Sequence, residues 1–184
     1  DNNRDKLGVT IDTKNPEGTE LALRLGEWAD VLLESFTAGT MDRMGIPFET
    51  LSRANPRLVQ GSLCGYGQTG PRREWPSYHP TSASLAGLNW LFSYEGGEPL
   101  GFGNSYMDFT TGYMGVIGVL DALLRREMTG HGDQIDVPQL ETGVFLLGTQ
   151  LLDWTVNQHE ATGEGNRAGA LGAPLQGCYR CRGD

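Results

Sequence analysis

The chain has 184 residues, of which 38% are hydrophobic and 20% charged, so its composition is that of one globular domain and excludes a disordered protein. A formal net charge of −9 argues against nucleic acid and against an anionic membrane as partners. Three cysteines are an odd, sparse set that indicates a reducing compartment, and no signal peptide is recognisable. We therefore expect a cytoplasmic protein.

The first half of the chain alternates strand-like and helix-like segments. Strands are predicted where side chains alternate or form short apolar runs, and helices where Pro or Gly bounds an apolar-faced stretch. The expected strands are residues 6–12, 30–35 and 57–67. The expected helices are residues 15–29, 39–45 and 47–56.

The second half is richer in predicted helices. These cover residues 81–92, 108–126 and 139–158, with a short strand at residues 134–138. In the middle helix small residues recur every three or four positions, a spacing that lets another backbone approach closely; they are Gly112, Gly115, Gly118 and Ala122. From Glu160 onward we expect a Gly-rich loop.

Strand, helix, strand, helix and strand at this spacing is the βαβ pattern, which predicts a Rossmann-like open parallel sheet with flanking helices. In such α/β sheets ligands bind outside the carboxyl ends of the strands. The loops that follow residues 12, 35 and 64 are therefore the first places to look for a site.

Asp108 lies between a glycine-rich loop and the longest predicted helix. Aspartate is a leading N-cap residue, because its carboxylate accepts backbone N–H bonds and the helix dipole favours a negative charge there. A carboxylate in that position can also attack an acyl carbon as a covalent nucleophile. Local sequence favours the cap and leaves both roles open, since one geometry serves both.

Other motifs point less strongly to chemistry. Gly65, Gly67 and Gly70 have G-x-G-x-x-G spacing, but Pro71 follows at once and is a poor start for the helix that a dinucleotide site requires. The loop is either an ordinary turn or one whose N–H groups approach a substrate. The pair Cys178 and Cys181 lacks a second pair or a nearby His, so zinc or redox chemistry is not expected.

Five segments, in the correct order, resemble the class III CoA-transferase family, which also contains the α-methylacyl-CoA racemases. They are NRDKLGVTIDTKNPEG (3–18), ADVLLESFTAGTMDRMGI (29–46), NPRLVQGSLCGYGQTGP (55–71), GHGDQIDV (130–137) and GNRAGALGAPLQGCYRCRGD (165–184). Such proteins are about twice this length. The resemblance implies that residues 1–184 are the central part of the large domain, without its start, the small domain and the C-terminal part, and that this piece alone is inactive.

In the transferases of this family the nucleophile is an Asp at a helix start, after a loop like GFGNSYMDFTTG (101–112), which corresponds to Asp108. The resemblance implies that CoA moves from an acyl-CoA to a free carboxylic acid through an aspartyl-CoA thioester. It implies CoA as a substrate with no permanently bound cofactor or metal, and an interlocked homodimer as the assembly.

The resemblance also implies a CoA site on the matching stretches, with Lys14 and Arg43 on the phosphates and Met44 against the adenine or pantetheine. A few placed cations would let an acidic protein bind this polyanion. The residues expected to line the site are Ile11, Asp12, Thr13, Lys14, Ser35, Phe36, Thr37, Arg43, Met44, Trp75, Ser77 and Tyr78.

The chain departs from the racemase pattern. Racemases of the family use a His as a base, and Tyr78 stands at that position, with His79 one place along. This favours a transferase. The alternatives are an acyl-CoA racemase or epimerase, with His79 as the acid/base group, and a non-catalytic CoA-binding subunit.

Overall fold

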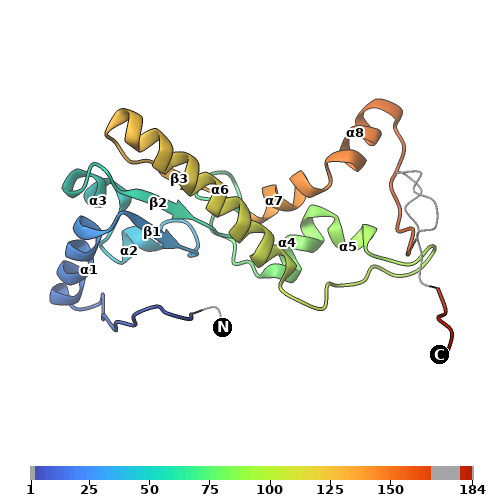
Figure 1. Cartoon of the computed structure of the whole chain (residues 1–184), viewed down its shortest axis with the longest axis horizontal. Coiled ribbons are helices and arrows are strands. Elements are labelled where there is room, and N and C mark those ends of the chain that lie inside the picture. The colour runs from blue at the N-terminus through green and yellow to red at the C-terminus, as the bar shows by residue number, and fades with distance from the viewer. Residues whose placement is uncertain (1–2, 167–178, 184) are drawn as a thin grey trace.

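The computed structural model describes residues 3–166 and 179–183 of the chain. Its core is a three-stranded parallel sheet (Figure 1). The strands are β1 (Val31–Glu34), β2 (Val59–Ser62) and β3 (Gln134–Asp136), in the order β1-β2-β3. Val31 pairs with Val59, and Gln60 pairs with Gln134. The open parallel sheet predicted from the βαβ pattern is confirmed, and each of its three strands is shorter than the predicted segment.

Eight helices connect or extend the described strands. The small helices beside β1 and β2 are α1 (Pro16–Trp28), α2 (Thr40–Arg43) and α3 (Phe48–Ala54). The helices of the second half are α4 (His79–Ala86), α5 (Leu88–Leu91), α6 (Tyr106–Thr129), α7 (Gln139–Leu146) and α8 (Gly148–Asn157). Figure 1 shows α6 crossing the molecule between the sheet and the α4–α5–α7–α8 arm.

The helix α6 covers one face of the sheet at close range. A Cβ atom on Gly115 would lie 2.4 Å from Cδ2 of Leu63, and one on Gly118 would lie 2.9 Å from Cγ2 of Ile135. Neither distance is possible without movement of the neighbour, so these glycines bring the helix onto the sheet. The close approach predicted from the small-residue spacing is confirmed.

The length and apolar composition of α6 would also suffice to cross a membrane. Its packing is that of a helix in a globular fold, because one side lies against β2, β3, α4 and α7. Its opposite side is apolar and exposed, at residues that include Tyr113, Ile117 and Leu124.

Residues 6–12 do not form the predicted strand. The segment is extended, but it pairs with none of the three described strands, and Leu7 is fully exposed. Alternating side chains favour a strand only where a second strand supplies the backbone hydrogen bonds.

Two predicted helices are each divided in two. Residues 81–92 break at Gly87, whose φ of 94° ends α4 in the left-handed region that glycine adopts readily. Residues 139–158 break at Leu147, where the Leu147 N–H bonds to the Val144 oxygen in a tighter turn before α8 begins. Both breaks are local turns that apolar periodicity does not reveal.

Candidate active site

The loop after β2 ties the carboxyl ends of the three strands together. The Gln68 N–H donates to Oδ2 of Asp136 at 2.7 Å, and Gln68 Nε2 donates to Oε1 of Glu34 at 3.3 Å. At Gly67, φ is 81° and a Cβ would lie 2.9 Å from Cγ of Pro138, so only glycine fits this turn. The glycines of residues 65–70 therefore serve turn geometry at the edge where ligands of parallel sheets bind.

Two titratable groups at this edge are shifted toward their neutral forms. Burial raises the pKa of the Cys64 thiol, and the charges of Asp136 and Glu34 raise it further. Loss of hydration also raises the pKa of Asp136, against the opposing hydrogen bond from the Gln68 N–H. Cys64 is 5% exposed, so it is a protonated core thiol at neutral pH and is unsuited to nucleophilic attack.

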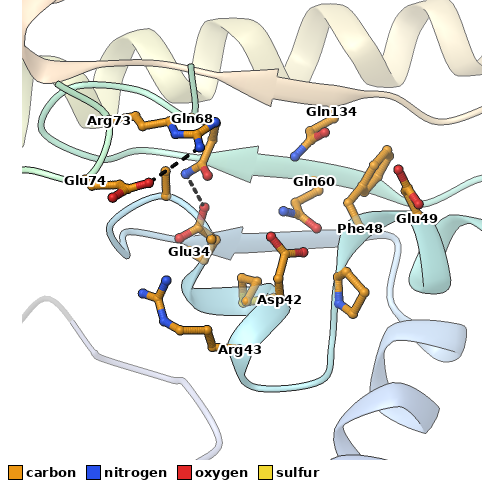
Figure 2. Close-up of a pocket in the computed structure, with 14 residues that line it drawn as sticks. Glu34, Asp42, Arg43, Phe48, Glu49, Gln60, Gln68, Arg73, Glu74 and Gln134 are labelled. Atoms are coloured by element: carbon orange, nitrogen blue, oxygen red, sulfur yellow. Dashed lines mark hydrogen bonds and ion pairs between the residues drawn. The ribbon is translucent and has the colours of Figure 1, made fainter. Parts of the chain in front are cut away.

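A cavity of about 570 Å³ opens on the face of the sheet opposite α6 (Figure 2). Arg43, one of the predicted CoA-binding residues, lies on its wall together with the Phe48 ring. The cavity carries more carboxylates than guanidinium groups, which are Glu34, Asp42, Glu49 and Glu74 against Arg43 and Arg73. Its interior therefore suits hydrogen-bond donors better than phosphate groups.

An unpartnered acceptor projects into this cavity. Gln60 is 2% exposed, and its Oε1 makes no hydrogen bond to the described residues. The Gln60 amide and the Asp42 carboxylate project from β2 and α2 into the same space (Figure 2). A buried acceptor without a hydrogen bond costs free energy of folding, so a ligand that donates a hydrogen bond to Gln60 Oε1 would be favoured at this wall.

Asp108 is the third residue of α6 and not its N-cap, so the expectation of a capping aspartate is wrong. The N-cap is Ser105, whose side chain makes no capping bond. Asp108 precedes Gly115 by two helical turns and so shares the side of α6 that faces the sheet. It is nevertheless exposed, because the first turn of α6 extends beyond the sheet edge. The carboxylate therefore lies on the sheet-facing side of α6 and is still accessible to solvent.

A side chain from another helix fixes the Asp108 carboxylate. Gln139, the first residue of α7, donates from Nε2 to Oδ1 of Asp108 at 2.7 Å. The Gln139 Oε1 accepts from Oγ of Ser82 at 2.8 Å, and Oγ of Ser77 lies 2.6 Å from that of Ser82. Ser77, predicted to line the CoA site, is thereby linked to Asp108 through Ser82 and Gln139.

His79 binds the start of the same helix. Its Nδ1 accepts the Met107 N–H at 3.2 Å, and its ring is 9% exposed. This bond supplies the cap that Ser105 does not, one residue before Asp108. Because Nδ1 accepts, the proton of the neutral ring is on Nε2.

The family model for CoA-transferase family III matches residues 1–184. The chain belongs to CoA-transferase family III. It is 38% identical over 152 residues to an acyl-CoA transferase of Fusarium pseudograminearum, covering 83% of this chain and 33% of that protein. It is 38% identical over 150 residues to the succinyl-CoA–L-malate CoA-transferase beta subunit of Chloroflexus aurantiacus, covering 81% and 37%.

Solved structures of other proteins share the fold. The chain matches a CAIB/BAIF family protein from Brucella suis with a TM-score of 0.83 and 32% identity, covering 88% of this chain and 43% of that one. It matches Rv3272 from Mycobacterium tuberculosis with a TM-score of 0.78, 32% identity, and 83% and 43% coverage. The chain therefore spans less than half the length of these relatives.

The predicted CoA contacts of this family III chain fall in four stretches. Residues 11–14 precede α1, where Oδ1 of Asp12 accepts the Lys14 N–H at 3.0 Å. Ser35, Phe36 and Thr37 follow β1, and the Phe36 N–H donates to Oε2 of Glu34 at 2.6 Å. Met44 ends α2 after Arg43, whose Nη2 donates to Oγ1 of Thr40 at 2.7 Å.

The fourth stretch lies before and at the start of α4. Trp75 is half-exposed and carries the Arg72 guanidinium over its ring, with 5.4 Å from Cζ to the centroid. Tyr78 is the exposed N-cap of α4. Of the twelve predicted contacts only Arg43 lines the cavity, and Ser77 is linked by side-chain hydrogen bonds to Asp108.

Sequence reasoning missed Gln139, Ser82 and Gln60. Gln139 follows β3 after two residues, and the rule that sites lie beyond strand carboxyl ends would have pointed to it had β3 been included. Ser82 and Gln60 carry no such signal, because their positions depend on packing. Cys178 lies outside the described residues, and among the described ones no His, Cys, Asp and Glu group could hold a metal ion.

Proposed function

We propose that the protein transfers CoA between an acyl-CoA donor and a free carboxylic acid, with Asp108 as the covalent nucleophile. Membership of CoA-transferase family III supports CoA transfer, and relatives from several organisms are named as CoA-transferases. The observation that carries the assignment to Asp108 is an exposed carboxylate in the first turn of α6, with one oxygen held by Gln139.

The proposed reaction exchanges bonds in balanced steps. An Asp108 oxygen attacks the donor acyl carbon, so that a C–O bond forms, the C–S bond breaks, and a mixed anhydride and CoA thiolate result. The thiolate attacks Cγ of Asp108, forming the aspartyl-CoA thioester and releasing the donor acid. The acceptor carboxylate attacks that thioester, and the freed thiolate then takes the acceptor acyl group and restores Asp108.

A carboxylate suits this sequence because both the anhydride and the thioester of Asp108 remain activated acyl groups. The first turn of α6 adds the positive end of the helix dipole, which favours the ionised side chain before attack. The edge of the sheet leaves the carboxylate open to a substrate.

The substrate class is proposed from the relatives. Those named act with succinyl-CoA and L-malate, acetyl-CoA and oxalate, or succinyl-CoA and glutarate. We propose a small carboxylic acid as acceptor for this protein too, with CoA bound transiently and no resident cofactor. We also propose an interlocked homodimer; the Chloroflexus relatives are named as alpha and beta subunits.

The racemase alternative receives no support. Relatives 38% identical to this chain are named as transferases, and His79 uses Nδ1 to accept the Met107 N–H inside the fold. A base that abstracts an α-proton needs a free acceptor nitrogen at the substrate, and the neutral ring has none left.

The test is hydroxylamine trapping on the intact protein. The protein is incubated with a panel of acyl-CoAs, quenched with hydroxylamine and digested, and the peptides are read by mass spectrometry. A hydroxamate on the Asp108 peptide, absent from the Asp108→Asn variant, is the expected result. Asp121, an exposed carboxylate on the same helix, is the internal reference. An unmodified Asp108 peptide in active protein would overturn the assignment.

A further inference from the structure

We propose that Gln139 is a positioning residue that holds Oδ1 of Asp108, so that Oδ2 is the oxygen that attacks. This inference rests on the proposed function, since it assigns roles to the two oxygens of the proposed nucleophile. The observation behind it is the hydrogen-bonded series from Ser77 through Ser82 and Gln139 to Asp108.

The direction of each bond in this series follows from the chemistry of its members. A carboxylate only accepts, so the Gln139 amide must turn its Nε2 to Asp108 and its Oε1 to Ser82. The single Ser82 hydroxyl proton then serves Gln139 Oε1 at 2.8 Å. The Ser77 hydroxyl is left to donate to Ser82 across 2.6 Å. The opposite amide orientation would place two acceptors together at Asp108.

Gln139 is itself held rigidly. Its backbone N–H donates to the Cys64 oxygen at 2.8 Å, and the Leu140 N–H donates to the Gly65 oxygen at 3.0 Å. The helix it begins packs against α4 and α6, the elements that carry Ser82 and Asp108. Ser82 is fully buried. The amide is therefore fixed before any substrate binds, as a positioning group requires.

This bond serves both halves of the proposed reaction. In the first step it restrains the rotation of the carboxylate and leaves Oδ2 without a protein partner among the described residues. In the second step Oδ1 is the carbonyl oxygen of the anhydride, and negative charge gathers on it when the thiolate attacks Cγ. The side-chain Nε2–H of Gln139 already points at that oxygen and stabilises the charge.

The test compares two substitutions in the intact protein. Gln139→Leu removes the donor and the acceptor, whereas Gln139→Glu keeps the shape and the acceptor for Ser82 but replaces the donor with a carboxylate oxygen beside Asp108. We expect kcat to fall about 100-fold in both, with the Gln139→Glu variant at least as impaired, and KM for the acyl-CoA to change less than about threefold.

A structural role would give a different pattern. If Gln139 only filled space, the isosteric Gln139→Glu variant would retain activity and Gln139→Leu would lose thermal stability. Glu141, an exposed residue of the same helix, provides the matched control, and Glu141→Gln should leave kcat unchanged. Ser82→Ala removes the bond that orients the amide and should lower kcat about tenfold.

The outcomes separate this inference from the proposed function. Retained kcat in both Gln139 variants, with Asp108→Asn inactive and the hydroxamate present on the wild-type Asp108 peptide, would overturn the role of Gln139 and leave the nucleophile in place. A wild-type protein that forms no hydroxamate on Asp108 would overturn both. Loss of kcat with unchanged KM and unchanged melting temperature supports the inference.

Discussion

The two ends of α6 differ in where the side chains that fix them come from. At its carboxyl end the buried Arg126 donates from Nη1 to Oδ1 of Asp30 at 3.1 Å and to the Arg57 carbonyl oxygen at 3.1 Å. At its amino end His79 and Gln139 bind the Met107 N–H and the Asp108 carboxylate.

Under the proposed function, the carboxyl end of α6 stabilises the fold and the amino end carries the reactive carboxylate. Arg126 projects from α6 and binds the Asp30 carboxylate and the main-chain oxygens of Asp30 and Arg57, so it anchors the helix beside the starts of β1 and β2. The amino end is bound by side chains that reach inward from α4 and α7, and these hold a carboxylate which stays exposed. Substitutions at one end should change stability, and substitutions at the other should change turnover.

The largest expected effect is on turnover at the amino end. Asp108→Asn replaces the proposed nucleophile with an amide of the same size, so transfer activity should fall at least about 1000-fold. The free energy of unfolding should change by less than about 0.5 kcal/mol, because the side chain is exposed. Steady-state kinetics and urea denaturation measure the two. An active Asp108→Asn variant would erase the distinction between the ends.

The next effect is on stability at the carboxyl end. Arg126→Ala leaves the carbonyl oxygens of Asp30 and Arg57 without this donor and should lower the free energy of unfolding by about 2 kcal/mol. The kcat of the folded fraction should stay near wild type. A variant of normal stability and low kcat would show that the carboxyl end takes part in turnover.

The middle of α6 sharpens the contrast through two glycines three residues apart. A Cβ on Gly115 would meet Leu63 at 2.4 Å, whereas a Cβ on Gly112 would meet nothing within 4 Å. Gly112→Ala should stabilise the protein by about 0.5–1 kcal/mol through helix propensity. Gly115→Ala should destabilise it by about 1 kcal/mol, because Leu63 must move. Equal effects in thermal unfolding would contradict the close packing.

The smallest effect concerns the thiol at the sheet edge. Because burial and then the Asp136 charge raise the pKa of Cys64, its alkylation rate should rise only at a pH above that of an ordinary thiol. Asp136→Asn removes a negative charge, so it should lower the pKa and shift this profile toward lower pH. Peptide-resolved iodoacetamide labelling measures both profiles, with the denatured protein as reference; an unshifted profile would contradict the effect of Asp136.

The sequence predicted the elements whose signals are local. Residues 30–35 and 108–126 became β1 and α6 because an apolar run between turns and a long small-residue spacing need no distant information. The prediction of a strand at residues 6–12 was wrong, since a strand depends on a partner elsewhere in space. The breaks at Gly87 and Leu147 were not predicted, because apolar periodicity continues across a single turn.

The site divides in the same way. Asp108 was found through a resemblance that spans its flanking loop and helix. Its predicted place as the N-cap was wrong, because the N-cap is Ser105, three residues earlier in the chain. Gln139 and Ser82 approach Asp108 only after α4, α6 and α7 have packed, which no spacing along the chain encodes.

The packing of Gly115 and Gly118 also sets the phase of α6. Each residue of an α-helix advances about 100° around the axis and about 1.5 Å along it, so Asp108 lies about 10 Å from Gly115 on nearly the same bearing. A roll of the helix anywhere along the sheet would swing the carboxylate by the same angle away from Gln139. The close packing of these two glycines against the sheet therefore also sets the direction in which the Asp108 carboxylate points.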